Sequence, residues 1–210
     1  MEMKRLEVGP LATNCYLLIN EDKLIVIDPG YYTGPLEEAV QQTGLPVEAV
    51  LITHAHFDHI WGLDALAEAC GGTVYALDKE RETFEDASLN LAGDFIDIDV
   101  RVNTPVRYFS EGDVLELAGL KFKTIWVPGH SCGGCCYYLE GEGILFPGDS
   151  LFYGSIGRTD GPQGDYEALT GALKEKVLTL PGDTLVYPGH GPETRIGFER
   201  QCNPFLREQL

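Results

Sequence analysis

The sequence predicts an α+β protein that folds as a four-layer αββα sandwich, in which two packed β-sheets are flanked by helices. Three observations support this prediction. The chain has two β-rich halves, each half contains helical segments for its outer side, and 210 residues suffice for one substantial core. We therefore expect residues 1–210 to form a single domain.

The first half is expected to open as a β-meander of three short strands. A polar turn, Asn20-Glu21-Asp22, separates the second strand from the third. The predicted strands cover residues 4–8, 14–19 and 24–27. A helix is then expected over 35–42, which Gly44 ends, followed by a buried strand over 47–53 that runs directly into His54.

A second helix is predicted over residues 62–70. Leu63, Leu66, Ala67 and Cys70 recur at the spacing of one helical face, and a Gly-Gly pair ends the run. A strand is expected over 73–76, which completes a strand-loop-helix-strand unit. Residues 78–105 mix acidic and apolar side chains without a clear period, so we expect a partly helical excursion there.

The second half repeats the β-rich pattern. Its predicted strands cover residues 113–117, 120–127, 135–139 and 143–146, with a last strand over 184–187. Asp165 is expected to cap a helix that continues to Val177. One face of that helix is apolar, because Leu169, Ala172, Leu173 and Val177 recur at helical spacing.

The composition excludes several classes of partner. Lys and Arg number 15 and Asp and Glu number 33, so the formal net charge is −18, and the cations form no run or stripe. We therefore expect no nucleic acid and no membrane as a partner. No apolar run approaches the roughly 20 residues of a spanning helix, and no secretory signal is recognisable. Six cysteines in a chain of this length favour reduced thiols and a cytoplasmic location.

A cluster of metal-binding side chains follows the strand over 47–53. His54, His56, Asp58 and His59 place three imidazoles and a carboxylate within six positions, and a loop at a strand end can turn all four inward. Nitrogen and hard oxygen together suit zinc, iron or manganese better than calcium. Four such groups exceed the three protein ligands of a mononuclear catalytic zinc site, so two divalent metal ions are expected, with zinc favoured.

One local pattern recurs three times in the second half: a strand is followed by Pro-Gly and then by a side chain that can bind metal. Proline ends the strand pairing and glycine permits a tight bend, which fixes the position of the next side chain. A single histidine or aspartate in such a turn is more often structural. All five histidines of the chain, however, lie in these turns and in the 54–59 loop, so the joint pattern is specific. The turns are Pro128-Gly129-His130, Pro147-Gly148-Asp149 and Pro188-Gly189-His190.

Together these motifs resemble the metallo-β-lactamase superfamily, in particular its small bacterial, glyoxalase II-like (hydroxyacylglutathione hydrolase-like) members. The resemblance also covers residues 13–16, 27–30 and 154–160. It implies the metallo-β-lactamase form of the αββα sandwich, with Asp28 behind the ligands as an orienting residue. The implied ligands are His54, His56 and His130 for the first metal, Asp58, His59 and His190 for the second, and Asp149 as the bridge.

The resemblance implies a metal-dependent hydrolase that cleaves a thioester such as a hydroxyacyl-glutathione. Two metals roughly 3.5–4 Å apart share one water and lower its pKa toward ~7, so a bridging hydroxide is the expected nucleophile. Asp58 and Asp149 are the expected catalytic carboxylates, and Asp58 also accepts a hydrogen bond from that hydroxide. The leaving thiolate has a pKa of about 8.5 and needs no further acid. The expected partner is a small anionic or thioester substrate.

Three side chains are candidates for contact with the substrate. Cys132 stands where the family usually has a small hydroxyl or apolar residue, and Arg158 and Arg195 are the cations placed nearest the predicted site. Each has a structural alternative: Cys132 fills a tight strand start, Arg158 braces its own loop, and Arg195 pairs with a nearby acid. The chain ends 20 residues after His190, without the helical region that supplies glutathione contacts in glyoxalase II, so recognition of glutathione stays open.

Three other functions stay open. A persulfide dioxygenase resembles this sequence but uses one iron and fewer of these ligands. A β-lactamase is disfavoured, because those enzymes commonly lack the bridging aspartate. A metallo-fold that only binds or senses usually has a broken ligand set, whereas this set is complete. The sequence leaves the native metal, the acyl group and the oligomeric state undetermined.

Overall fold

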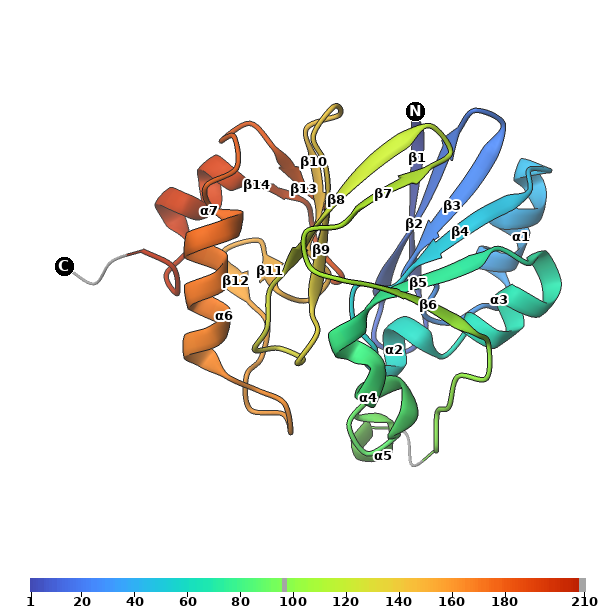
Figure 1. The fold of residues 1–210 in the computed structure, drawn as a ribbon, viewed down its shortest axis with the longest axis horizontal. Coiled ribbons are helices and arrows are strands. Elements are labelled where there is room, and N and C mark those ends of the chain that lie inside the picture. Colours follow the sequence, from blue (N-terminus) through green and yellow to red (C-terminus); the bar gives the residue numbers. More distant parts are fainter. Residues whose placement is uncertain (96–97, 208–210) are drawn as a thin grey trace.

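The computed structural model of the chain describes residues 1–95 and 98–207. Two six-stranded sheets lie face to face at the centre, and helices cover their outer faces (Figure 1). The predicted α+β class and the four-layer αββα order are therefore confirmed. None of the helices within the described ranges has the length and apolar content that a membrane crossing requires.

The first sheet contains the predicted meander and a parallel part. Its strands, in spatial order, are β1 (Glu2–Val8), β2 (Thr13–Asn20), β3 (Lys23–Ile27), β4 (Val47–Leu51), β5 (Thr73–Leu77) and β6 (Val106–Phe109). The first three pair antiparallel, and β3 to β6 pair parallel. Helices α1 (Pro35–Thr43) and α3 (Leu63–Cys70) cover the outer face. Because β3, β4 and β5 run in the same direction, their carboxyl ends meet at one edge of the sheet.

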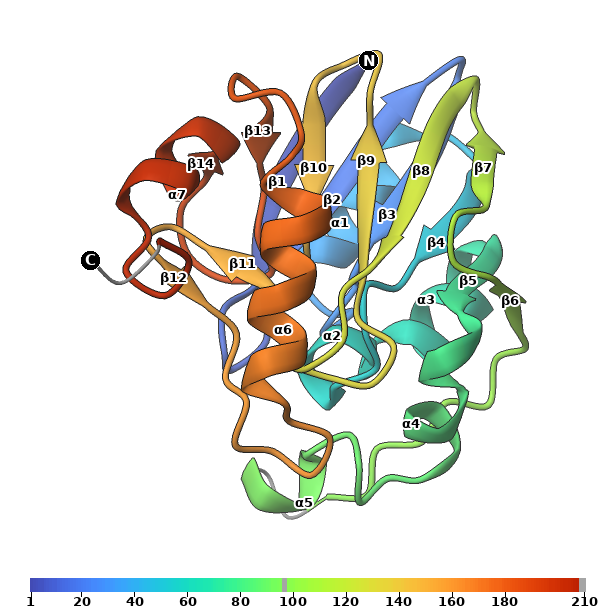
Figure 2. The same cartoon turned by 60° about the vertical axis from the view of Figure 1, so that its left-hand side comes forward.

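The second sheet is mostly antiparallel. In spatial order it contains β14 (Thr194–Arg195), β13 (Leu185–Val186), β10 (Ile144–Phe146), β9 (Cys135–Leu139), β8 (Leu120–Trp126) and β7 (Val114–Leu117). A small hairpin of β11 (Leu151–Phe152) and β12 (Ser155–Ile156) extends from it. Figure 2 shows α6 (Tyr166–Ala172) lying across this sheet, with α7 (Ile196–Cys202) beside it. The cap at Asp165 is confirmed, because its side chain accepts a hydrogen bond from Ala168 N at 3.0 Å.

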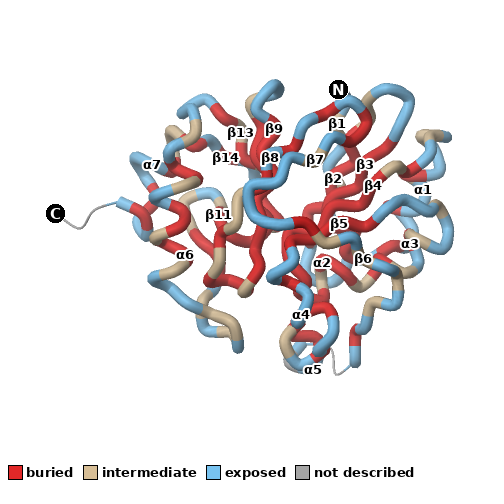
Figure 3. Tube along the Cα trace, viewed as in Figure 1, coloured by how far each residue is buried: buried red, intermediate tan, exposed pale blue. Residues whose placement is uncertain are grey.

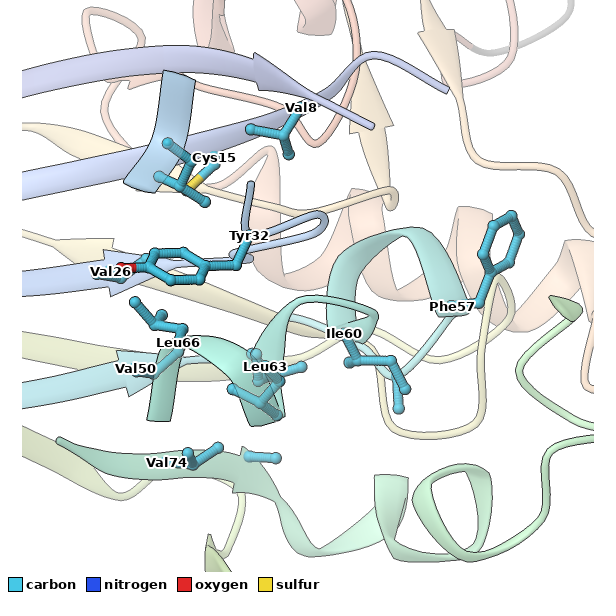
Figure 4. Packing of buried hydrophobic residues seen from close by; sticks show 14 of the residues in the cluster. Val8, Cys15, Val26, Tyr32, Val50, Phe57, Ile60, Leu63, Leu66 and Val74 are labelled. Carbon is cyan, nitrogen blue, oxygen red and sulfur yellow. The ribbon is translucent and has the colours of Figure 1, made fainter. Parts of the chain in front are cut away.

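Three apolar layers hold the sandwich together, and buried segments follow the central strands in Figure 3. Successive side chains of a strand point to opposite faces, so Val26 and Val50 face the outer helices while Ile25 and Leu51 face the second sheet. Figure 4 shows Leu66 of α3 packed with the first of these groups. A strand buried on both faces reads as a continuous apolar run, which explains why residues 47–53 could be recognised.

Several elements differ from the sequence-based expectations. Strand β6, the hairpin β11–β12, β14 and helix α7 were not predicted, because short edge segments carry too few residues to show a period. The helix after Asp165 changes at Leu173 into a π-helix, η2 (Leu173–Val177). The excursion over 78–105 is partly helical as predicted, with η1 (Asp78–Glu80), α4 (Arg81–Glu85) and α5 (Ala92–Phe95), although its residues 96 and 97 lie outside the described residues.

Candidate metal centre

The 54–59 segment begins where β4 ends, at the lower end of the strands in Figure 1. His54 and His56 lie in a loop, as expected. Asp58 and His59, in contrast, lie in a one-turn helix, α2 (Phe57–Ile60), for which His56 is the N-cap residue. This helical turn brings both side chains back toward the strand ends.

The structure brings all seven predicted metal-binding side chains together. Within the described residues, three overlapping groups have candidate ligand atoms that all lie within 4.8 Å of one another. They are His54, His56 and His130; His54, His59 and Asp149; and Asp58, His59 and His190. The first and third groups match the two ligand sets that the resemblance implies, while metal binding by them stays a prediction.

The carboxylate of Asp149 lies between those two sets. Its Oδ2 is 3.7 Å from His130 Nε2 and 3.5 Å from His190 Nε2, and its Oδ1 is 3.4 Å from His59 Nε2. One side chain therefore faces histidines of both sets, as a bridging ligand would.

The buried atoms at the centre fit a metal. Those that have no hydrogen-bond partner include His54 Nε2, His59 Nε2, His130 Nε2 and Asp149 Oδ1. A buried polar atom without a partner costs about 1–3 kcal/mol, so such atoms rarely gather at one point without a ligand. Nitrogen and carboxylate donors in this arrangement suit a divalent transition metal.

The opposite ring nitrogens of these histidines are anchored. Fixing one nitrogen leaves the other free to bind a metal and sets the plane of the ring. Three rings are anchored by hydrogen bonds: His54 Nδ1 with Thr53 Oγ1 (3.1 Å), His130 Nδ1 with Arg158 O (2.9 Å) and His190 Nδ1 with Leu11 O (3.1 Å). His59 Nδ1 lies 2.9 Å from Asp28 Oδ2 in ion-pair contact.

Asp28 lies behind the cluster, where the resemblance places an orienting residue. It follows β3 and accepts hydrogen bonds from Thr53 N at 2.8 Å and Thr53 Oγ1 at 2.6 Å, while its Oδ2 faces His59. The end of β3 is thereby joined to the loop that follows β4.

Burial keeps His54 and His56 of the first set neutral. Desolvation, followed by the neighbouring histidines, holds the pKa of His54 well below its usual value. Desolvation also lowers the pKa of His56, to about 3. Both rings are therefore neutral at pH 7, which is the form that binds a metal.

In the second set, the histidine pKa values are raised instead of lowered. Burial disfavours charge on His59, but the carboxylates of Asp58, Asp28 and Asp149 together raise its pKa well above the usual value. The pKa of His190 is also raised against the effect of burial, first by its hydrogen bond to Asp58. Burial raises the pKa of Asp58, but the nearby His59 and His190 outweigh it and lower the value. Without a metal, protons thus balance the carboxylates here.

Sequence reasoning missed the role of Thr13 and Asn14 at the start of β2. Thr13 Oγ1 donates to Asp58 Oδ2 at 2.8 Å. Asp58 Oδ2 also lies 3.0 Å from His190 Nε2. Asn14 Nδ2 donates to the carbonyls of Pro188 and Gly191 at 2.9 Å, which holds the turn that carries His190. The available signal was two polar residues at the start of an apolar strand.

The three predicted substrate contacts lie outside the metal-binding groups. Cys132 Sγ donates to Lys79 O at 2.9 Å, and burial raises the pKa of its thiol, which disfavours the thiolate. The guanidinium of Arg158 pairs with Asp160 at 2.7 Å. Arg195 Nη1 donates to Asp183 O at 3.4 Å and lines a pocket with Tyr153, Tyr187 and Phe198. Substrate contact by these side chains stays a prediction.

Known sequences with a similar pattern cover nearly the whole chain. The model of the metallo-beta-lactamase superfamily matches residues 8–190. The probable metallo-hydrolase YqgX of Bacillus subtilis is 41% identical over 207 residues, with 98% of each chain covered. The hydroxyacylglutathione hydrolase GloC of Haemophilus influenzae is 32% identical over 211 residues, with 100% of each chain covered.

Solved structures show the same similarity. The B3 metallo-beta-lactamase BLEG-1 is 37% identical, with a TM-score of 0.91 over 99% of this chain and 100% of that chain. TTHA1623 in a di-iron-bound form is 39% identical, with a TM-score of 0.86 over 97% of this chain and 100% of that chain. ETHE1 from Myxococcus xanthus is 29% identical, with a TM-score of 0.77 over 98% of this chain and 84% of that chain.

Proposed function

Because the chain belongs to the metallo-beta-lactamase superfamily, we propose that it is a hydrolase that uses two divalent metal ions to cleave a thioester of the hydroxyacyl-glutathione class. The observation that carries this proposal is the position of Asp149 between the two sets of ligand atoms. A carboxylate shared in this way is typical of a binuclear site. The full-length similarity to GloC supports the thioester class.

In this proposal each metal would be held by its own set of ligands, and Asp149 would be shared between the two. Zinc is the proposed metal, with iron and manganese as alternatives, because histidine and aspartate suit all three. The di-iron-bound form of TTHA1623 keeps iron among the alternatives. The first set is His54, His56 and His130, and the second is Asp58, His59 and His190.

Two ions held here would supply a hydroxide nucleophile near neutral pH and polarise the substrate carbonyl. The chain's own residues set the geometry. Thr13 holds Asp58 Oδ2 by a hydrogen bond, and the Asp28 carboxylate lies 2.9 Å behind the ring of His59. Asp58 and Asp149 are assigned the catalytic role because they are the carboxylates that face the cluster. A thiolate leaves with a pKa of about 8.5, so no protein acid is required.

The test combines metal analysis with turnover. We expect the protein purified without added metal to contain about two metal ions per chain and to hydrolyse S-lactoylglutathione. Two ions without turnover of any thioester would refute the substrate class. Inactivity of the fully loaded protein on thioesters, lactones, phosphodiesters and nitrocefin would indicate a binding or sensing module. Turnover of nitrocefin alone would indicate a lactamase, to which the similarity to BLEG-1 gives weight.

A second candidate function is the oxygen-dependent oxidation of a persulfide at a single iron. It is favoured by the group of His54, His59 and Asp149, because two histidines and one carboxylate are the ligand set of many mononuclear iron oxygenases. One bound iron per chain, oxygen uptake and release of sulfite would establish this function in place of hydrolysis.

We further propose that residues 1–210 form one domain of a cytoplasmic protein that acts on a small molecule. The formal net charge of −18 and the six free cysteines support this setting. Two divalent ions offset this negative charge locally, which would admit an anionic substrate to the site.

A further inference from the structure

Glu80 is a buried carboxylate at the end of the third parallel strand, β5. Only 1% of the residue is exposed, and no cation of the described chain forms an ion pair with it. Burial raises the pKa of its carboxyl group, which four donors, Ser131, Thr83, Gly133 and Ala55, partly offset. A buried acid without a cation is costly unless hydrogen bonds satisfy it. Its partners therefore indicate its role.

Apart from Thr83 of α4, those partners belong to two different loops. Glu80 Oε1 accepts hydrogen bonds from Ser131 Oγ and from Gly133 N, the latter at 3.0 Å. Its Oε2 faces Ala55 N at 3.4 Å. Ala55 lies between His54 and His56, and Ser131 directly follows His130. One carboxylate thus joins the two loops that carry the three histidines of the first set.

The contact between Glu80 and the second loop is tight. A Cβ at Gly133 would collide with Glu80 N and would lie 2.7 Å from Glu80 Cγ, so no larger residue fits there without movement. A backbone hydrogen bond from Cys135 N to Thr53 O, at 2.8 Å, joins the same two segments nearer the sheet. The segments therefore stay connected when Glu80 is changed, and a variant can fold with its histidines displaced.

Glu80 and Asp28 occupy comparable positions on either side of β4. Asp28 follows β3 and contacts His59 of the second set. Glu80 follows β5 and contacts the loops of the first set. Each set of ligands therefore has its own buried carboxylate, supplied by the strand next to β4.

We propose that Glu80 is a positioning residue that sets the separation of His54 and His56 from His130, and thereby the affinity and geometry of the first metal site. This inference rests on the proposed metal centre.

The experiment uses cobalt(II) as the probe on the full chain after its metal has been removed with a chelator. Cobalt affinity is measured by competition with a chelator, and the ligand-field absorption spectrum reports coordination geometry. We expect Glu80→Gln to weaken binding of the first cobalt ion by about 10–100-fold and to change its spectrum. This readout does not depend on the activity of the loaded enzyme.

The matched control is Glu199→Gln. Glu199 is also fully buried and accepts hydrogen bonds from Gly154, Thr194 and Asn203, but none of its partners lies beside a histidine of the first set. We expect this variant to unfold at a lower temperature with the cobalt affinity and spectrum of the unaltered protein.

A second variant keeps the proposal testable if Glu80→Gln does not fold. Ser131→Ala removes one donor to Glu80, so we expect a smaller loss of cobalt affinity in the same direction. A folded Glu80→Gln with unchanged affinity and spectrum would overturn the inference, as would unchanged binding in Ser131→Ala. Absence of cobalt binding by the unaltered protein would instead refute the metal centre itself.

Discussion

In the first half of the molecule four candidate metal ligands lie within six positions after one strand, whereas in the second half one candidate follows each of three strands, directly after Pro-Gly. The crowded loop, residues 54–59, is oriented by contacts from segments remote in sequence. Thr13, Asp28 and Glu80 lie far from it in the sequence, and each contacts either a side chain or a backbone N–H of the loop.

The three turns of the second half are constrained by their own backbone, in addition to contacts from distant segments such as Asn14. Gly148 has a φ of 53°, in the left-handed region, and a Cβ there would collide with Thr53. Gly189 has no room for a Cβ, which would overlap Asp149 Oδ1 and approach His59. Local backbone shape helps to place these candidate ligands, with Asn14 and Leu11 as additional remote contacts of the His190 turn, whereas the first four depend on contacts remote in sequence. The two halves should therefore respond differently to substitution.

The largest effect is expected where the two halves meet. Asp149→Ala removes the carboxylate that faces histidines of both sets, so we expect metal content and turnover to be lost together. The loss should exceed the roughly 10–100-fold effects of changing a residue behind the ligands. Elemental analysis and thioester hydrolysis measure it. Normal metal content with full turnover would remove Asp149 from the mechanism.

Asp28→Asn tests the external support of the crowded loop. Asparagine tolerates the φ of 49° at this position, so the backbone is kept while the charge facing His59 is lost. We expect the affinity of the second metal to fall by about 10–100-fold, measured by chelator competition. Asp22→Asn is the control, because Asp22 is exposed and has a similar φ of 56°. Equal affinities in the two variants would contradict the role of Asp28.

Gly189→Ala tests the local support of the second half. The added methyl would displace Asp149, so we expect a loss of stability of about 1–3 kcal/mol together with reduced metal content. Urea denaturation of the metal-free protein and elemental analysis measure the two effects. In Gly171→Ala, within α6, the methyl meets open space, so that variant should keep its metal and gain about 0.5–1 kcal/mol. Similar results for both variants would refute the backbone argument.

The smallest expected effect is a release of protons on metal binding. The carboxylates that raise the pKa of His59 and of His190 favour protons on these rings in the metal-free protein, and a metal must displace such protons. The lowered pKa values of His54 and His56 mean that these rings release none. Affinity should therefore increase with pH, with about one to two protons released per chain. Calorimetry in buffers of different ionisation enthalpy measures this number, and a value of zero would contradict the charge balance described for the second set.

The sequence by itself determined the layers, most of the strands and the seven metal-binding candidates that the structure brings together. Strand β4 shows a continuous apolar run, and helix α3 shows its period within a few residues. A Pro-Gly turn or a cluster at positions 54–59 is equally local. Such features need no knowledge of distant segments to be recognised.

Only the tertiary structure decided which other residues meet the cluster. Ser131 and Glu80 are 51 positions apart, and Thr13 and Asp58 are 45 apart, so no periodicity connects them. The short edge strand β6 depends in the same way on its pairing with β5. The physical reason is that a hydrogen bond to a buried carboxylate depends on where the folded sheet places two loops. The local sequence between two such loops does not specify how far apart they lie in the folded protein.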